Sequence, residues 1–512
     1  MPELKPWQRP RQLLRQLSKP SADKLAGFSG KLTTLQLTAG AATFGLVIAA
    51  GAVAAAGPWD SSGQRTAERD RAASQDAWGG ADHAGGAPGR APEAAPSAPS
   101  VLAGLGAPAG TAPRPTDRAL AEVLDPLLKD PALGPKRSAV VLDAASGKRV
   151  YGKNAGDGLT PASTIKIATA VAALSAVGPD HRIATRTVLE PDSSDVVLVG
   201  GGDPTLTARK DGRYTDTAAS LRRLAEDTAR SLKSRDIDEI KLSYDTSLYS
   251  GPPQHVIGPN ENITPVSALM ADEGRLDDSS SGPAPRAGDP AAEATKKFAG
   301  FLKDHGITTK PAPDAAPTPS KASDRAESLA KVESPPLSSL VERMLTHSDN
   351  DIAEALARQT AVAAKEPASF DGAGRAVRAR LEKLGLPLSG ATFADGSGLD
   401  RADRVSAELL AALLDHAADP GRPELRSVVT GLPVAGFTGT LVDRYPKDSP
   451  GTGLVRAKTG TLTGVNSLAG TVVDADGRLL LFAFMTTGTT DPQAAQSALD
   501  HMASTVANCG CR

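Results

Sequence analysis

An uncharged run of 21 residues, 37–57, limits what the first part of this chain can become. A run of this length can cross the hydrocarbon layer of a membrane as a helix, which takes about 20 residues. Residues 1–36 carry seven Lys and Arg against two acidic residues, and a basic flank of this kind stays in the cytoplasm. We therefore predict a basic cytoplasmic segment, a single-pass anchor and a remainder outside the cell membrane. Residues 54–56 also resemble a cleavage site, so a secreted protein with a signal peptide stays open.

The stretch that follows, residues 58–116, is unsuited to forming a core. Ala, Gly, Pro and Ser make up 37 of its 59 positions. Folding it would bury too little apolar surface to offset the ordering entropy of the chain. We predict a disordered linker here, which confines a compact fold to the residues from about 117 onward.

Strand and helix patterns occur at both ends of the remaining chain. Residues 138–154 alternate apolar runs around a Ser-Gly turn and predict a β-hairpin. Residues 163–178 predict a helix that is buried on nearly all sides. Three strands and a closing helix are predicted within residues 454–507. Because aromatic residues are only 3% of the chain, the cores must be built mainly from Ala, Val and Leu.

This order of elements predicts an α+β fold, in which an antiparallel sheet assembled from distant parts of the chain is flanked by helices. We expect one domain to comprise residues 117–182 and 335–512. Residues 183–334 have strand and helix patterns of their own and are expected to form one or two inserted domains.

Charge and cysteine usage exclude several functions. Lys and Arg number 57 against 59 Asp and Glu, so there is no electrostatic reason to expect a nucleic-acid partner. The two cysteines, Cys509 and Cys511, lack neighbours for a four-ligand zinc site, which leaves a local strained disulfide or no bond. The seven histidines show no metal-ligand spacing, and no metal or organic cofactor is expected.

Three short motifs carry the chemistry. Ser163 lies three residues before Lys166, but the same pattern recurs at residues 21–24, so it is weak alone. Ser348-Asp349-Asn350 is the one Ser-x-Asn of the sequence and lies between two predicted helices. Lys458-Thr459-Gly460 is the one Lys-Thr-Gly and lies in a predicted strand. In this order and these settings, the three motifs match a penicillin-interacting serine site.

With these motifs the sequence resembles the low-molecular-mass penicillin-binding proteins, and within them the D-alanyl-D-alanine carboxypeptidase/endopeptidase type (class C, serine peptidase family thirteen). The likeness covers about residues 119–487 and includes four further stretches, at residues 200–207, 262–269, 394–401 and 432–441. The 185 positions between Ser163 and Ser348 also fit a family with domains inserted there. The resemblance implies the penicillin-binding-protein/β-lactamase-like transpeptidase fold.

The chemistry needs a base beside a serine hydroxyl, which is a poor nucleophile by itself. Residues three apart on a helix share a face, so Lys166 can reach the oxygen of Ser163. Lysine is a base only when neutral, and burial with a second cation nearby, here Lys458, lowers its pKa. We expect Lys166 to be the base and Ser348 to pass a proton toward the leaving amine, although the identity of the base is disputed in related enzymes.

The remaining motif residues are predicted to hold substrate. The resemblance gives Asn350 the role of binding the substrate amide. Thr459 and Thr461 offer hydroxyls for a terminal carboxylate beside Lys458, and Gly460 would let an extended peptide lie close along the strand. The resemblance also implies an oxyanion hole made by the backbone N–H groups of Ser163 and Thr461.

The sequence thus predicts a penicillin-sensitive serine DD-peptidase that forms an acyl-enzyme on Ser163. It would hydrolyse the D-Ala-D-Ala bond of peptidoglycan stem peptides, with cross-links as a second possible substrate, and β-lactams would acylate the same serine. One alternative is a β-lactamase, but none of the six asparagines has the Glu four residues before it that one large class uses. The other is a catalytically silent wall-binding scaffold. The oligomeric state is not predicted.

Overall fold

The computed structural model describes residues 112–210, 218–313 and 315–511 of the 512-residue chain. The predicted cytoplasmic segment 1–36, the predicted anchor or signal 37–57 and most of the predicted linker 58–116 lie outside the described residues. Among the residues that are described, no helix combines the length and the apolar character needed to cross a membrane.

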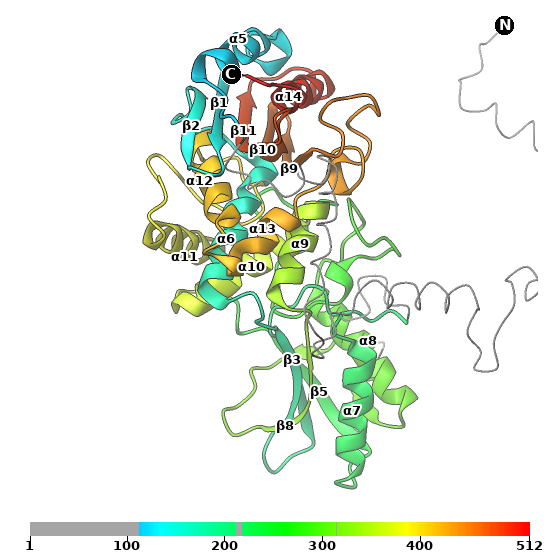
Figure 1. Ribbon diagram of the computed structural model, residues 1–512. Coiled ribbons are helices and arrows are strands. Elements are labelled where there is room, and N and C mark those ends of the chain that lie inside the picture. The colour runs from blue at the N-terminus through cyan, green and yellow to red at the C-terminus, as the bar shows by residue number, and fades with distance from the viewer. Residues whose placement is uncertain (1–111, 211–217, 314, 512) are drawn as a thin grey trace, which may run out of the picture. The chain divides into compact units, whose positions relative to one another are not determined.

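A five-stranded antiparallel sheet forms the centre of the first part of the fold (Figure 1), in the order β2-β1-β11-β10-β9. Its strands are β1 (Lys136–Asp143), β2 (Lys148–Lys153), β9 (Val455–Leu462), β10 (Val465–Val473) and β11 (Leu479–Thr487). The hairpin β1-β2 pairs with β11, so strands more than 300 residues apart in sequence become neighbours. The predicted antiparallel sheet from distant sequence is confirmed.

Alternate residues of these strands face two separate cores, because successive side chains of a strand point to opposite faces. Ala139 and Val141 face the helices α5 (Asp117–Leu127) and α14 (Pro492–Ala507), while Val140 between them faces the opposite helical layer. Phe482 and Phe484 fill the first core with ring centroids 5.0 Å apart. The sheet therefore lies between two layers of helices.

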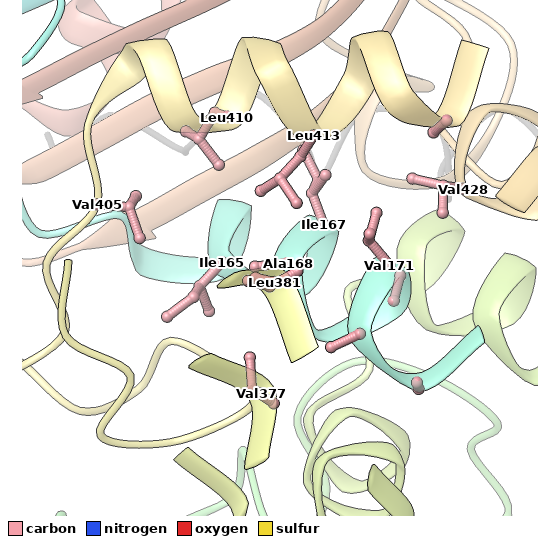
Figure 2. Close-up of a cluster of buried hydrophobic side chains, with 14 of the residues drawn as sticks. Ile165, Ile167, Ala168, Val171, Val377, Leu381, Val405, Leu410, Leu413 and Val428 are labelled. Carbon is pink, nitrogen blue, oxygen red and sulfur yellow. The ribbon is translucent and has the colours of Figure 1, made fainter. Parts of the chain in front are cut away.

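The opposite layer is built around helix α6 (Lys166–Val177), in which residues 166–174 are all buried. Figure 2 shows Ile167, Ala168 and Val171 of this helix enclosed by side chains of α11 (Phe370–Lys383) and α12 (Ala407–Ala418) and by Val428 of α13 (Arg426–Thr430). Small alanines let the neighbouring helices approach α6 closely, as dense packing requires. The predicted all-round burial of this helix is confirmed. The helices around it are α9 (Leu337–His347), α10 (Asn350–Ala364), α11 (Phe370–Lys383), α12 (Ala407–Ala418) and α13 (Arg426–Thr430).

A second, six-stranded sheet lies within the range predicted for the insertion. Its strands are β3 (Ala184–Leu189), β4 (Asp195–Val199), β5 (Glu239–Asp245), β6 (Thr308–Lys310), β7 (Thr318–Pro319) and β8 (Glu327–Glu333). Strand β3 pairs antiparallel with β4 and β8, whereas β4 pairs parallel with β5. Helices α7 (Leu221–Lys233) and α8 (Pro290–Asp304) supply Leu224, Leu232, Phe298 and Leu302 to its core.

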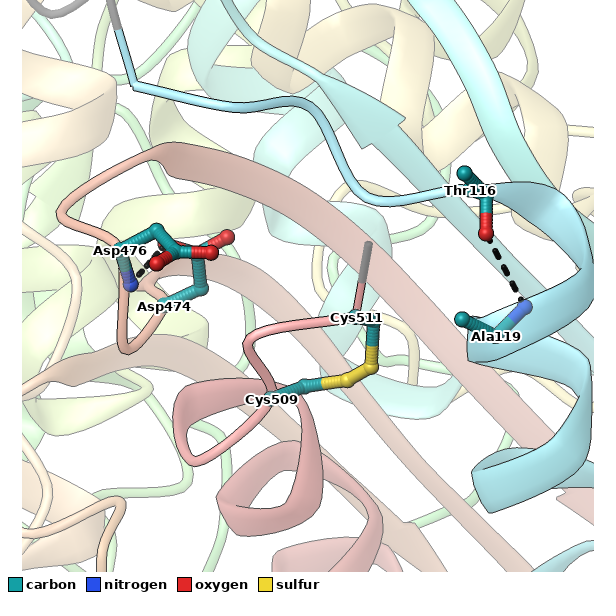
Figure 3. The surroundings of a disulfide bond; sticks show 6 residues. All are labelled: Thr116, Ala119, Asp474, Asp476, Cys509 and Cys511. Atoms are coloured by element: carbon teal, nitrogen blue, oxygen red, sulfur yellow. Dashed lines mark hydrogen bonds between the residues drawn. A yellow bond between two sulfur atoms is a disulfide. The ribbon is translucent and has the colours of Figure 1, made fainter.

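The two ends of the described chain meet beside the first sheet (Figure 3). The side chain of Thr116 caps α5 by accepting from the Ala119 N–H at 3.2 Å, and the Thr116 N–H donates to the Cys511 carbonyl at 2.8 Å. Residues 112–116, placed in the disordered linker by the sequence, are therefore part of the folded body because these bonds hold them. Cys509 and Cys511 form a disulfide, the first of the two predicted alternatives.

Candidate active site

Ser163 lies in a 3-10 turn, η3 (Ala162–Ile165), directly before α6. The predicted helix from residue 163 thus begins as α-helix only at Lys166. The 3-10 turn keeps the predicted contact, because side chains three residues apart are eclipsed in it. Ala162 enters the turn with a left-handed φ of 49°, a strained conformation for a residue with a side chain.

Lys166 is fully buried and makes three hydrogen bonds around one nitrogen. Its Nζ donates to Ser163 Oγ at 2.9 Å, to Asn350 Oδ1 at 2.7 Å and to the Ser397 carbonyl at 2.6 Å. Two of these acceptors belong to Asn350 and Ser397, which lie more than 180 residues after Lys166 in the sequence. The amine is therefore held against the hydroxyl that it is predicted to deprotonate.

Burial sets the charge state of Lys166. Removal of water lowers the pKa of its amine to about 8, against the negative charges of Asp395, Asp349, Glu354 and Asp403, which raise it. An amine with a pKa near 8 is partly neutral at neutral pH, whereas an exposed lysine is not. Lys166 can therefore accept a proton where an ordinary lysine could not.

Ser348 and Lys458 form the second serine-lysine pair of the site. Ser348 ends helix α9 with a left-handed φ of 57°, and its Oγ accepts from Lys458 Nζ at 2.8 Å. Lys458 is fully buried on β9, and it also donates to the Thr459 carbonyl at 2.8 Å. Burial, followed by the charges of Lys166 and Arg444, holds the pKa of Lys458 well below its ordinary value.

Asn350 begins helix α10 and bridges Lys166 to the inserted segment. Its Oδ1 accepts from Lys166, and its Nδ2 donates to the Asn262 carbonyl at 2.9 Å. Asp349, between the two, caps α10 by accepting from the Ile352 N–H at 3.0 Å. The Ser-Asp-Asn turn thus points Ser348 and Asn350 at the two buried lysines, while its aspartate caps the helix.

The strand β9 lies at the edge of the first sheet and packs against η3. Thr459 and Thr461, two residues apart, share one face of the strand. The Thr459 hydroxyl pairs with that of Thr440 at 2.9 Å, and the Thr461 hydroxyl accepts from Gln496 at 3.3 Å. Their predicted role in binding a carboxylate is compatible with this placement and stays a prediction.

Gly460 lies at a close contact between the strand and the turn that carries Ser163. A Cβ at this position would lie 2.2 Å from Ser467 Oγ and 2.5 Å from the Pro161 carbonyl, so the space on that side of Gly460 is filled. The glycine therefore allows the close approach of the turn to the strand, and its predicted role beside an extended peptide stays a prediction. The same contact is fixed by Ser467 Oγ, which donates to the Pro161 carbonyl at 2.7 Å.

A cavity of ≈ 220 Å³ opens onto these residues. Ser163, Ser348, Asn350 and Thr461 line it, whereas Lys166 and Lys458 lie buried behind the two serines. The inserted segment completes the wall with Asn262, Arg275, Gly282, Pro283 and Arg286, and His347, Asp349 and Leu399 line the remainder. The first two motifs therefore line one cavity, and the third adjoins it through Thr461, the residue after Gly460, and through the hydrogen bond from Lys458 to Ser348.

Sequence reasoning missed the arginines of this wall. Arg286 is paired with Asp351 of α10 at 3.0 Å, and Arg275 with Glu273 at 2.8 Å. An isolated arginine in an insertion has no spacing that marks it. The one available signal was the proximity in sequence of the stretch 262–269, which we noted for its family likeness.

The turn at residues 394–401 was also noted only for its family likeness. It holds Lys166 in the site through the Ser397 carbonyl. The Asp395 carboxylate accepts from the N–H groups of Ser397 at 3.0 Å and Gly398 at 2.5 Å. Burial acts to raise the pKa of Asp395, but hydrogen bonds from His255 and Gly398 lower it to about 2. Gly398 is required here, because a Cβ would lie 2.0 Å from the Ala162 carbonyl.

Two buried groups of side chains have the donor atoms for a metal ion among the described residues: His255 with Glu354 and Asp395, and Glu273 with Asp349 and Asp351. In each group a carboxylate is already paired with a buried cation. Glu354 contacts Arg358 at 3.4 Å, and Asp351 contacts Arg286 at 3.0 Å. Both groups fit a role in ion-pair networks around the site.

Known proteins resemble this chain in sequence and in structure. A carboxypeptidase of Mycobacterium tuberculosis is 36% identical over 437 residues, covering 82% of this chain and 91% of that protein. The D-alanyl-D-alanine carboxypeptidase of Actinomadura sp. (strain R39) is 29% identical, covering 73% of this chain and 82% of that protein. Penicillin-binding protein 4 of Haemophilus influenzae has a similar structure, with a TM-score of 0.59, 22% identity, and coverage of 75% of this chain and 97% of its own.

The structural likeness confirms the predicted α+β fold of penicillin-binding-protein type for the described residues. A family model, described as the D-Ala-D-Ala carboxypeptidase 3 (S13) family, matches residues 120–285 and 281–509. These ranges include all three motifs and the inserted segment. The chain therefore belongs to the D-Ala-D-Ala carboxypeptidase 3 (S13) family.

Proposed function

We propose that this chain is a penicillin-sensitive serine DD-peptidase that hydrolyses the D-Ala-D-Ala bond of peptidoglycan stem peptides. The observation that carries the proposal is the pairing of two fully buried lysines, Lys166 and Lys458, with the two serines that line the cavity, Ser163 and Ser348. Family membership and the names of the relatives support the substrate class.

Acylation begins when neutral Lys166 takes the proton of the Ser163 hydroxyl across the 2.9 Å hydrogen bond. The Ser163 oxygen then attacks the carbonyl carbon of the penultimate D-Ala. The backbone N–H groups of Ser163 and Thr461 receive the oxyanion, and each such donor is worth about 2.7–4 kcal/mol of barrier. Asn350, fixed between Lys166 and the Asn262 carbonyl, holds the substrate amide.

Breakdown of this intermediate expels the terminal D-alanine. Ser348, bonded to Lys458, gives its proton to the leaving amine, so the C–N bond breaks as the N–H bond forms. Ser348 then receives the proton that Lys166 took from Ser163, which returns Lys166 to its neutral form. Thr459 and Thr461, beside Lys458, hold the terminal carboxylate. Water then attacks the ester of Ser163: Lys166 takes a proton from that water and returns it to the Ser163 oxygen, and the shortened peptide leaves as its carboxylic acid.

The same acyl-enzyme accounts for sensitivity to β-lactams, whose ring carbonyl takes the place of the D-Ala carbonyl. A cut of cross-links would follow the same steps, with a longer leaving amine. Localisation belongs to this proposal as well: the apolar run 37–57 would anchor the chain in the cell membrane, with the catalytic part outside, where its substrate is.

Release of D-alanine from a peptide ending in Lys-D-Ala-D-Ala tests the proposal. The wild-type protein should release one D-alanine per peptide, and Ser163→Ala should release none while retaining its fold by circular dichroism. A wild-type protein that releases no D-alanine, or a Ser163→Ala variant that is as active, would rule the proposal out. Rapid turnover of a chromogenic cephalosporin would instead favour a β-lactamase.

A further inference from the structure

The inserted segment contains a buried histidine that reaches the peptidase helices. His255 is 2% exposed, and its ring stands edge-on to Phe370 of α11 with centroids 5.2 Å apart. Its Nε2 lies 2.9 Å from Oδ2 of Asp395. The Ile257 N–H donates to Nδ1 at 3.2 Å, so in this arrangement Nδ1 carries no proton and Nε2 is the donor to Asp395.

Asp395 connects this histidine to the catalytic lysine. Its other hydrogen bonds hold the N–H groups of Ser397 and Gly398, which fixes the orientation of the intervening peptide units. The Ser397 carbonyl of the same turn accepts from Lys166 Nζ at 2.6 Å. A continuous path of hydrogen bonds thus leads from the ring of His255 to the amine of Lys166.

We propose that His255 is a positioning residue for acylation: by donating to Asp395 it fixes the turn whose Ser397 carbonyl holds Lys166, and it offsets the Asp395 charge that Lys166 feels. The inference rests on the proposed role of Lys166 as the base. It gives the inserted segment a part in proton transfer in addition to its contribution to the cavity wall.

The charges around the two titrating groups determine the direction of the effect. Burial lowers the pKa of Lys166, and the acidic groups that face it raise it, with Asp395 the strongest, followed by Asp349, Glu354 and Asp403. Lys458 is the other buried amine of the site, and burial, followed by the charge of Lys166, holds its pKa well below its ordinary value. Burial acts to lower the pKa of His255, but the pairing with Asp395, then Glu354 and Asp400, raises it. Arg358 stacks over the Phe370 ring, with its guanidinium carbon 4.2 Å from the ring centroid, and pairs with Glu354.

Removal of the Nε2 proton donor should therefore raise the pKa of Lys166. Without His255 as partner, the Asp395 carboxylate is less compensated and stabilises the ammonium form of Lys166 more strongly. Acylation requires the neutral amine, so the rising limb of its pH profile should move to higher pH. A shift of about one pH unit would lower the rate at neutral pH about tenfold and leave the alkaline plateau in place.

The test compares acylation rates by a fluorescent penicillin across the pH range for the wild type, His255→Phe and His255→Gln, in the full chain. Phe keeps a ring against Phe370 without a donor, and Gln can place its amide nitrogen near the position of Nε2. The proposal expects an upward shift for His255→Phe and a wild-type profile for His255→Gln. His305→Phe, at an exposed histidine that ends α8, is the matched control and should not shift.

Profiles of His255→Phe and wild type that superimpose, once scaled to the amount of active protein, would overturn the proposal. So would a Gln variant that shifts as far as the Phe variant. If His255→Phe does not fold, His255→Asn replaces it, because its amide nitrogen reaches the Nδ1 position and not Asp395; Asn must then shift and Gln must not. A wild-type protein that no penicillin labels would refute the proposed function itself, so the two failures are distinct.

Discussion

Two buried lysines at the centre of one site cannot both keep an ordinary pKa. Lys166 and Lys458 are fully buried, and the charge of Lys166 lowers the pKa of Lys458 in addition to the effect of lost water. Lys166 lies against the Ser163 hydroxyl and Lys458 against the Ser348 hydroxyl, so each serine has a partner amine whose affinity for a proton is reduced. Burial of these two residues is therefore the main cause of their lowered pKa values.

The first residue-scale prediction is a rise of the acylation rate with pH. Because the pKa of Lys166 is lowered to about 8, the neutral base is scarce below that pH and complete above it. The rate of acylation by penicillin should fall about tenfold per pH unit on the acidic side, reach half its maximum near pH 8 and level off above that pH. A stopped-flow pH profile checks this. A rate that stays constant from mildly acidic to alkaline pH would exclude Lys166 as the titrating base.

The second concerns the threonines of β9. Hydrogen bonds to a charged group contribute about 1.5–3 kcal/mol each, so Thr461→Val should slow acylation by carboxylate-bearing penicillins by about tenfold or more, and Thr459→Val likewise. The matched control is Thr463→Val, two residues further and exposed in the turn after the strand, which should leave the rate unchanged. Equal rates for all three variants would show that the carboxylate binds elsewhere.

At the scale of elements, the contact between η3 and the edge strand β9 places the nucleophile. Pro161 and Thr164 of the turn bond to Ser467 of β10 across the position of Gly460. On the outer side of β9, residues 433–435 bond to Val455 and Ala457, and no strand of the described part of the chain pairs with the strand beyond them, so that part of the edge can face a peptide. The nucleophile and the strand for the substrate are therefore joined by one tight contact.

This contact predicts that Gly460→Ala damages both the fold and the reaction. The added methyl would overlap Ser467 and the Pro161 carbonyl, and overpacking of this kind costs about 1–3 kcal/mol. A lowered melting temperature and slower penicillin acylation are expected together. Gly300→Ala is the matched control: it lies in α8 with open space around it, and it should be neutral or stabilise by up to about 1 kcal/mol. Normal acylation in Gly460→Ala would contradict this account of the contact.

The elements differ in how far the sequence could predict them. Ser163, Ser348 and Lys458 each stand in a short motif, and the strands around Lys458 have plain apolar patterns, so the site and the first sheet were predictable. His255, Arg275 and Arg286 stand in no motif, because their partners Asp395, Glu273 and Asp351 become neighbours only through tertiary folding. The close contact at Gly460 was missed for the same reason, since the register of β9 against η3 decides what faces it.

For the molecule as a whole, the site belongs to the part of the chain from residue 112 onward, and the apolar run 37–57 is predicted to act only as an anchor. Removal of residues 1–57 should therefore release the protein from the membrane fraction without changing its acylation rate. Cell fractionation with penicillin labelling measures both. A full-length chain found in the soluble fraction would contradict the anchor, and a loss of labelling on truncation would show that these residues contribute to the site.

Insertion of a second sheet between Ser163 and Ser348 is the other feature of the whole chain. Residues of the inserted segment line the cavity. One of them, His255, is hydrogen-bonded to Asp395 in the turn that holds Lys166. The proposed active site is thus assembled from the three motifs and the insertion, between residues 163 and 461. The proposed reaction requires the Ser163 oxygen to form the acyl bond.

Mass spectrometry of the protein after incubation with benzylpenicillin tests whether Ser163 carries the acyl group. We expect one adduct per chain, carried by the peptide that contains Ser163 and absent from the Ser163→Ala and Lys166→Ala variants. An adduct on another serine, or none on the folded wild-type protein, would contradict it.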